Sequence, residues 1–115
     1  SIKTWGVDIN TTGGLRLVAR DVDDTQVLDT GYGSDLNNGK TVLVSLLLEQ
    51  NGSAIDYEIG FMPPNDNYYF QSGTLASNTV GRFTQLQVGP SNVLSSIAVG
   101  HLAILNSITL ASAML

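Results

Sequence analysis

The stretch Ile55-Asp56-Tyr57-Glu58-Ile59-Gly60-Phe61 decides the fold class, because a large hydrophobic residue recurs at every second position along it. A period of two is typical of a β-strand with one face in the core and the other in solvent. We therefore expect the odd-numbered residues of the stretch to point inward and the carboxylates Asp56 and Glu58 to point outward. Pro63-Pro64 ends the strand, since proline cannot donate a hydrogen bond to a ladder.

The residues before this strand predict its hairpin partner. Thr41–Glu49 is apolar on both faces, so hydrophobicity alone would also permit a helix. Its valines and the bounding Gly39 and Asn51-Gly52 favour a central strand instead. Asn51-Gly52 is the strongest short hairpin signal in the chain, because both residues accept the positive φ of a type I′ turn.

The same periodicity predicts a domain built almost entirely of strands. Further strands are expected over residues 2–9, 15–20, 26–30, 68–75, 82–88 and 97–105, separated by turn-forming segments. Many short strands at short spacing indicate an all-β fold, here an antiparallel two-sheet sandwich of the jelly-roll type. We expect one domain over residues 1–115, excised from a larger protein. Residues 106–115 are expected to form a tail or a short helix. For residues 107–115 an edge strand remains an alternative.

The charge of the chain excludes several classes of partner. The formal net charge is −5, and the five basic residues are scattered along the sequence. Nucleic-acid binding needs clustered Lys and Arg, so no nucleic-acid partner is expected. The same deficit argues against an anionic membrane surface. No apolar run approaches the ~18 residues of a membrane span, so no membrane insertion is expected.

Composition also limits the chemistry. Hydrophobic residues make up 43% of the chain and charged residues 13%, which is too apolar for a disordered protein. Cysteine is absent, which excludes disulfides, zinc–thiolate sites and cysteine nucleophiles. We expect no cofactor and no metal.

The first candidate for chemistry is the pair Asp56 and Glu58. Residues two apart on a strand point the same way at roughly 7 Å, whereas retaining glycosidases hold their carboxyl groups ~5–5.5 Å apart. One glucanase family with the jelly-roll fold carries its carboxylates on one strand in a pattern like Glu-x-Asp-x-x-Glu. The order is reversed here, and Phe61 stands where a third acid would be. A solvated outer strand face therefore explains the pair more simply than catalysis.

Two other candidates also have simpler structural interpretations. Asp21, Asp23 and Asp24 offer oxygens to a calcium ion, but the pattern of an EF-hand is absent and aspartate is a good turn former. His101 is the only histidine, and no nucleophile-elbow pattern marks a serine for a triad. We expect an aspartate turn, and a buried, hydrogen-bonded histidine on a strand.

Aromatic residues in loops are the best candidates for ligand contacts. Trp5 and Tyr57 lie on apolar strand faces and are expected in the core. Loops carry function more often than strands do, and sugar sites combine an aromatic face with nearby amide and carboxylate groups. The predicted ligand-binding residues are Tyr32, Asn65, Asp66, Asn67 and Tyr68.

The segments Val80–Pro90 and Ser95–Ile104 resemble the closing strands of concanavalin A-like (laminin-G-like) jelly-roll domains in tail proteins of actinobacterial phages and prophages. Those domains end with a "Gly-Arg-x-Thr-x-x-x-Val-x-Pro" strand and a "x-Ala-x-Gly-His-x-x-Val" strand. Here the first begins at Gly81-Arg82 and the second contains Gly100-His101. The likeness covers roughly Lys40 to Leu105.

The resemblance implies a structural or adhesive role without catalytic residues. We therefore expect a non-enzymatic module of a phage or prophage tail, or of a cell-surface protein, located on the virion tail or outside the cell. Its expected partners are a cell-surface glycan, other tail subunits or a second copy of itself. Such jelly rolls are usually longer, so neighbouring sequence or another chain would complete the sheet. Two alternatives stay open: an active or degenerate glycan hydrolase using Asp56 and Glu58, and a self-assembling fibre or shell subunit with exposed sheet edges.

Overall fold

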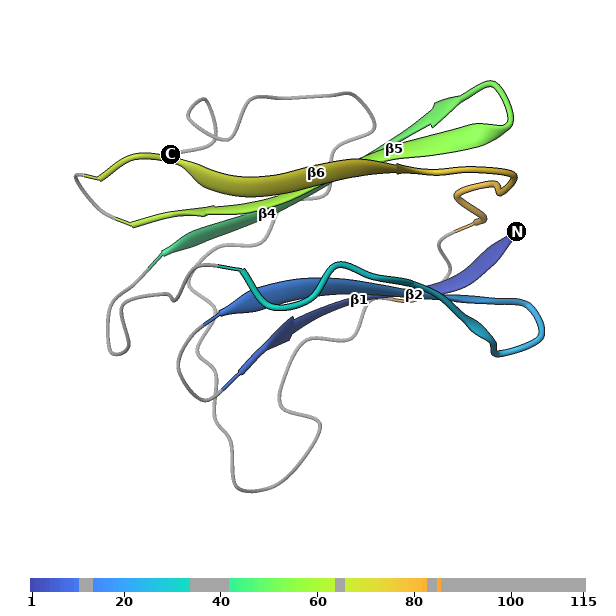
Figure 1. Cartoon of the computed structure of the whole chain (residues 1–115), viewed down its shortest axis with the longest axis horizontal. Coiled ribbons are helices and arrows are strands. Elements are labelled where there is room, and N and C mark those ends of the chain that lie inside the picture. The colour runs from blue at the N-terminus through green and yellow to red at the C-terminus, as the bar shows by residue number, and fades with distance from the viewer. Residues whose placement is uncertain (11–13, 34–41, 64–65, 83–84, 86–115) are drawn as a thin grey trace.

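The computed structural model describes residues 1–10, 14–33, 42–63, 66–82 and 85. These residues form six strands and no helix (Figure 1). The strands are β1 (Ile2–Ile9), β2 (Leu15–Asp21), β3 (Gln26–Asp29), β4 (Leu43–Asn51), β5 (Ala54–Met62) and β6 (Tyr69–Leu75). In the part of the chain that is described, no helix could therefore cross a membrane.

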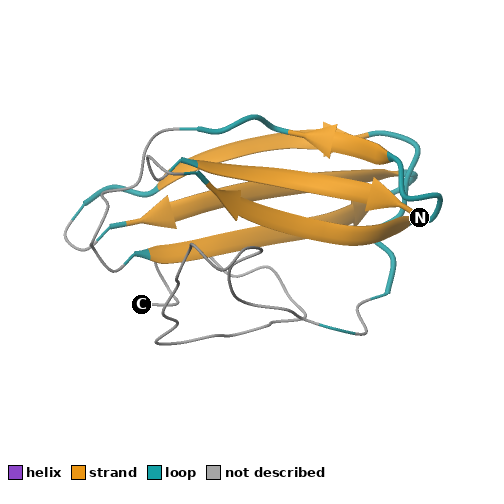
Figure 2. Cartoon of the chain, turned by 90° about the horizontal axis from the view of Figure 1, so that it is seen from below, coloured by secondary structure: helices purple, strands orange, loops and turns teal. Residues whose placement is uncertain are grey.

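The strands make two antiparallel sheets that face each other as the two layers of a sandwich-like architecture (Figures 1 and 2). The first sheet has the order β1-β2-β3 and the second β4-β5-β6, so each is a meander of consecutive strands. The predicted all-β, two-sheet antiparallel fold is confirmed at this level.

The first sheet forms because β2 alternates between buried and partly exposed positions. Leu15, Leu17 and Ala19 are buried, as the spacing predicts. The turn before β2 is closed by Asn10, whose side-chain oxygen accepts from the Gly14 amide at 2.7 Å. Asp21 closes the next turn, since its Oδ1 accepts from two backbone amides downstream.

The second sheet is centred on β5, the strand with the uninterrupted alternation. Ile55, Ile59 and Phe61 are buried, while Asp56 and Glu58 are only partly so, and the predicted inward and outward faces are confirmed. β5 ends at Met62, immediately before the prolines.

Two details of the predicted hairpin differ from the structure: the place of β4 in its sheet, as far as the described residues show it, and the turn type. Among the described residues β4 lies at the edge of its sheet, and β5 takes the centre. The apolar character of β4 goes with partial burial on both of its faces. Asn51 pairs with Ala54 as the last residue of β4, which leaves Gly52-Ser53 as the loop. Of the two loop residues, Gly52 has a positive φ of 62° and Ser53 does not. This fits a type II′ turn and not the predicted type I′ turn.

The core lies between the two sheets. One buried cluster joins Leu15 and Leu17 to Ile59 and Phe61, so both layers contribute to it. Full burial of each such side chain is worth roughly 1.5–3 kcal/mol. Trp5 packs against the core and donates its indole N–H to the Val80 carbonyl at 3.0 Å. The core positions predicted for Trp5 and Tyr57 are confirmed.

The predicted strands over 82–88 and 97–105 and the ambiguous segment 107–115 lie almost wholly outside the described residues. Arg82 and Gln85 are described, and neither is in a strand. His101 and most of the segment that carries the family resemblance therefore lie outside the described part as well.

Candidate functional site

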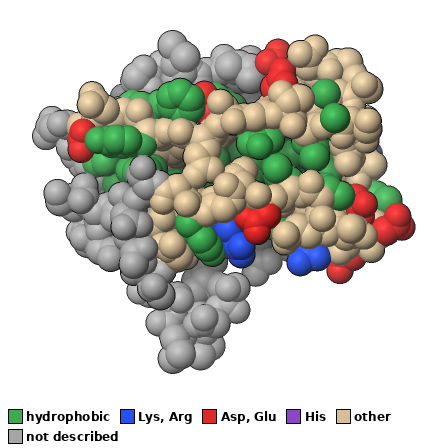
Figure 3. Space-filling model, viewed as in Figure 1, with side chains coloured by type: hydrophobic (Ala, Val, Ile, Leu, Met, Phe, Trp, Pro, Cys, Tyr) green, Lys and Arg blue, Asp and Glu red, His purple; other side chains and the backbone are tan. Residues whose placement is uncertain are grey.

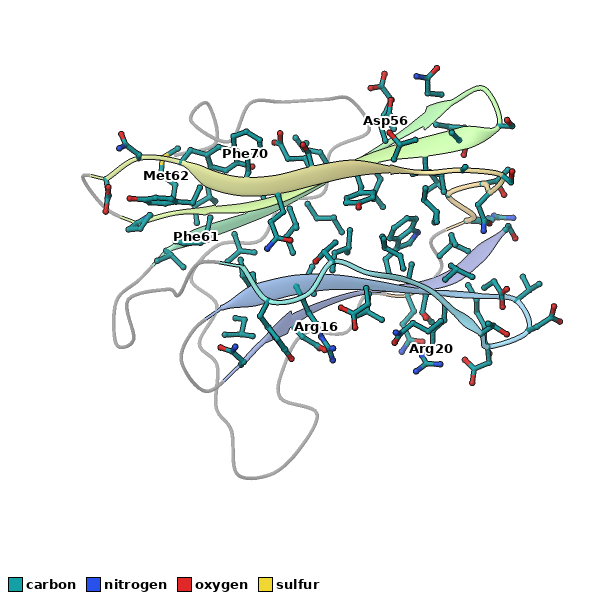
Figure 4. The ribbon with its side chains drawn as sticks, in the orientation of Figure 1. Arg16, Arg20, Asp56, Phe61, Met62 and Phe70 are labelled. Carbon is teal, nitrogen blue, oxygen red and sulfur yellow. The ribbon has the colours of Figure 1, made fainter. Side chains whose placement is uncertain are left out.

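The strongest candidate surface is the side of the second sheet that points away from the first, which we call the outer face. Figure 4 shows Asp56 and Phe70 on this side, with Arg16 and Arg20 on the opposite surface of the sandwich. The strand register places side chains of β4, β5 and β6 in rows across it. Its members are Ser45, Leu47, Glu49, Asp56, Glu58, Gly60, Tyr68, Phe70, Ser72 and Thr74.

Carboxylates and hydroxyls occupy one half of the outer face. Thr74 donates to Asp56 at 2.8 Å, and Asn51 donates to the other oxygen of the same carboxylate at 3.1 Å. Glu49 pairs with Asp56 across the ladder, and Glu58 lies two positions along β5. The side chains of Glu49, Asp56, Glu58 and Thr74 help to line an open depression of about 380 Å³. The depression is large enough for a small ligand, since such sites span ≈ 300–1,000 Å³.

An aromatic pair occupies the other half. Tyr68 and Phe70 stack with ring centroids 5.7 Å apart and an angle of 15° between their planes. Tyr68 lies over Gly60, where a side chain would collide with the ring. Phe70 is 58% exposed, so its ring is open to solvent and to a ligand.

The hydroxyl of Tyr68 links the two halves. It donates to the Glu58 carboxylate at 3.0 Å and lies 2.9 Å from the Ser45 hydroxyl. Burial raises the pKa of Tyr68, and the hydrogen bond to Glu58 raises it further, while the hydrogen bond with Ser45 lowers it. Tyr68 therefore remains a protonated donor throughout the neutral range.

Among the residues that the structure describes, every charged side chain of the outer face is acidic. β4, β5 and β6 contain Glu49, Asp56 and Glu58 and no lysine or arginine. In Figure 3 the visible Lys and Arg side chains lie over the first sheet, in the lower part of the view. The charged side chains visible over the second sheet, in the upper part, are all Asp or Glu. Like charges repel, so this face disfavours anionic ligands.

The structure separates the residues predicted to bind a ligand. Tyr68 lies on the outer face, but its hydroxyl is engaged by Ser45 and Glu58. Asp66 and Asn67 lie in the β5–β6 loop, where the Asp66 carboxylate accepts from the Asn67 amide and the Tyr69 hydroxyl. Asn65 lies outside the described residues.

Tyr32 lies on the opposite surface of the sandwich. Its ring is 4.8 Å from the Arg16 guanidinium, which also donates to Asp8 and Asp29. The Asp8 hydrogen bond is the main reason that the pKa of Arg16 is raised. Tyr32 therefore packs on a charged cluster of the first sheet and cannot share a site with Tyr68.

The aspartate turn between β2 and β3 has a structural role. Asp21 Oδ1 accepts from the amides of Asp23 and Thr25, and Asp24 adopts a positive φ of 64°. The predicted turn formation is confirmed. No group of three or more metal-ligating side chains occurs among the residues that the structure describes.

A smaller opening of about 220 Å³ lies between the sheets near Gly33 and Gln71. Core residues line it, among them Leu15, Ile59 and Phe61, and the lining includes no acidic or basic side chain. Hydrophobic side chains are visible between the sheets on this side of the molecule (Figure 3). The opening is the rim of the core and offers no polar group to orient a ligand other than Gln71, Tyr69 and backbone atoms.

Sequence reasoning missed Phe70, Ser45 and Thr74. Each lies on a strand, whereas aromatic ligand contacts were expected in loops. A signal was present in Gly60, because a glycine inside a strand often marks the close approach of another group. That group is Tyr68, which places Phe70 beside it.

No protein-family model matches the chain, and neither a similar curated protein nor a similar solved structure was found.

Proposed function

We propose that this domain is a non-enzymatic adhesion module that binds a neutral glycan on its outer face. One observation carries the proposal: the exposed ring of Phe70 is stacked on Tyr68 beside hydrogen-bonding carboxylates and hydroxyls on the same face. An aromatic surface next to oriented polar groups is the combination that sugar recognition requires.

The chemistry of a pyranose matches both halves of this face. The apolar C–H face of the sugar ring packs on an aromatic ring, which contributes buried area and a favourable quadrupole contact. Its hydroxyls donate to carboxylates such as Asp56 and to the oxygen of hydroxyls such as Thr74, whose own proton is donated to Asp56. The carboxylates make anionic glycans unfavourable, which is why we propose a neutral one.

The hydrogen bonds around the carboxylates support binding over hydrolysis. Asp56 accepts from Thr74 and Asn51, and Glu58 accepts from Tyr68. Both side chains are thus presented as acceptors. Hydrolysis of a glycosidic bond needs one carboxyl group to deliver a proton to the leaving oxygen.

We place the module in a phage or prophage tail or a cell-surface protein, and take its fold to be a concanavalin A-like jelly roll. The support is the resemblance of Val80–Pro90 and Ser95–Ile104 to such domains. Tail subunits or a second copy of the chain would then be neighbours in the assembled structure. The ligand would be a host-wall glycan.

Calorimetric titration with chitohexaose, cellohexaose and the anionic polysaccharide alginate tests the proposal. We expect a neutral oligosaccharide to bind, alginate not to bind, and Phe70→Ala to weaken binding by about ten-fold through loss of the aromatic contact. Val22→Ala is the matched control, because Val22 is 60% exposed and lies in the turn after β2. Absence of binding to every neutral glycan tried, or equal binding by Phe70→Ala, would overturn the proposal.

A further inference from the structure

We infer that Tyr68 is a positioning residue of the outer face: it does not itself contact the glycan but fixes Phe70 and Glu58, which do. The inference rests on the proposed function and assigns a distinct role within it. It begins from the observation that the hydroxyl and the ring of Tyr68 both already have protein partners.

The hydroxyl of Tyr68 completes a directed chain of hydrogen bonds. A carboxylate can only accept, so Tyr68 donates its single proton to Glu58. Ser45 must then donate its own hydroxyl proton to Tyr68. Ser45 is the only buried polar side chain in the described part of the protein, at 6% exposure. The chain is therefore anchored in a buried group at one end and reaches a ligand-facing carboxylate at the other.

The ring of Tyr68 fixes Phe70 by a separate contact. Gly60 pairs with Phe70 across the β5–β6 ladder, and Tyr68 covers the space above Gly60. Phe70 can then stack against Tyr68 while its own ring stays exposed. Ordering the two contacting groups before binding reduces the entropy lost on association.

A double-mutant cycle on chitohexaose affinity tests the inference, with Tyr68→Phe and Glu58→Ala made singly and together in the full chain. Tyr68→Phe keeps the ring over Gly60 and removes the hydroxyl. We expect it to weaken binding about five-fold, the loss of roughly one hydrogen bond. In the Glu58→Ala background the same change should have almost no effect, because Tyr68 acts through Glu58. Tyr69→Phe removes a neighbouring hydroxyl bound to Asp66 and is the control.

The outcomes separate the two proposals. Binding by the wild type with unchanged affinity in Tyr68→Phe would overturn the positioning role and leave the glycan-binding face intact. An equal loss from Tyr68→Phe with and without Glu58 would also overturn it, because a direct contact or a general loss of structure adds independently. If the wild type binds neither chitohexaose nor any other neutral glycan, both proposals fall together.

Discussion

Tyr68 lies across the backbone of Gly60 and fills the space that a side chain at position 60 would need. The two residues are brought together by the β5–β6 hairpin, because Gly60 pairs with Phe70 and Tyr68 immediately precedes β6. This contact lets a tyrosine hydroxyl reach across the sheet to Ser45 on β4 and Glu58 on β5. The stacking of Phe70 on Tyr68 and the hydrogen bond to Glu58 both depend on this position of Tyr68.

Gly60→Ala should therefore destabilise the domain through Tyr68. The added methyl group would collide with the ring, and overpacking of this kind costs roughly 1–3 kcal/mol. Chemical denaturation of Gly60→Ala, Tyr68→Ala and the double mutant measures the coupling. We expect Gly60→Ala to cost much less once Tyr68 is removed.

Gly52→Ala provides the contrast. Gly52 has a φ of 62°, and no atom lies within 4 Å of the position that an added methyl group would take, so the cost of about 1 kcal/mol comes from the backbone alone. That cost should be the same with and without Tyr68. A Gly60→Ala cost that is likewise independent of Tyr68 would show that the contact is not tight in solution.

Gln50 should be a strong local determinant of stability. Its Nε2 lies 3.0 Å from each of the carbonyl oxygens of Gly52, Ala54 and Asn78, which share its two protons, and its Oε1 accepts from the Val80 amide at 2.9 Å. The side chain thereby joins the β4–β5 hairpin to the segment that follows β6. We expect Gln50→Glu to lower the free energy of unfolding by about 1 kcal/mol, because a carboxylate cannot donate to the three carbonyl oxygens that it would face.

Gln50→Met keeps the length of the side chain without adding charge, and it should destabilise the domain less than Gln50→Glu. Denaturant titrations of both variants check this order. The reverse order, or wild-type stability in Gln50→Glu, would contradict the role of Gln50 as a link between the two segments.

The raised pKa of Tyr68 predicts how stability changes at high pH. Burial favours the protonated phenol in the folded state, so the unfolded chain loses its tyrosine proton first, near the ordinary value of 10.0. The stabilising contribution of Tyr68 is complete below pH 10 and is lost as the pH rises through the higher pKa of the folded state. Denaturation at a series of pH values from 8 to about 11.5 tests this.

Tyr68→Phe separates this effect from that of Tyr69, whose pKa is raised mainly by the negative charge of Asp66. The variant should lose stability less steeply above pH 10 than the wild type, whereas Tyr69→Phe leaves the contribution of Tyr68 in place. Parallel curves for the wild type and Tyr68→Phe would show that the pKa of Tyr68 is not perturbed.

The hydrolase alternative predicts that the protein releases reducing ends from a glycan. If Asp56 and Glu58 act only as acceptors, as we propose, prolonged incubation with cellohexaose or chitohexaose should release none. Release that disappears in Glu58→Gln would replace the adhesion proposal with a catalytic one.

Sedimentation velocity on the same samples tests the self-assembling alternative, for which a concentration-dependent oligomer is expected.

Local sequence determined much of the fold and little of the site. The alternation from Ile55 to Phe61 predicted which side of β5 is buried, because side-chain direction in a strand follows position alone. The aspartate turn was predictable for the same reason, since Asp21 caps amides only two and four residues away. The exact loop of the β4–β5 hairpin was not, because the pairing of Asn51 with Ala54 decides it.

The candidate site depends on register between strands, which a single sequence does not reveal. Tyr68 was predicted to contact a ligand, but its partners Ser45 and Glu58 come from two other strands. Tyr32 was grouped with Tyr68 by residue type, and the two sheets place them on opposite surfaces. Only the cross-strand neighbours show that the exposed ring of Phe70 lies on the outer face.

Binding of a neutral glycan to the outer face of β4–β5–β6 is tested most directly by NMR. The isotope-labelled chain is titrated with chitohexaose, and the amide and aromatic shifts are followed. We predict saturable shifts confined to the outer face, largest at Phe70, Asp56 and Thr74, and their loss in Phe70→Ala. Shifts centred on Tyr32 and Arg16 of the first sheet, or no shifts at any accessible concentration of neutral glycan, would contradict glycan binding at this face.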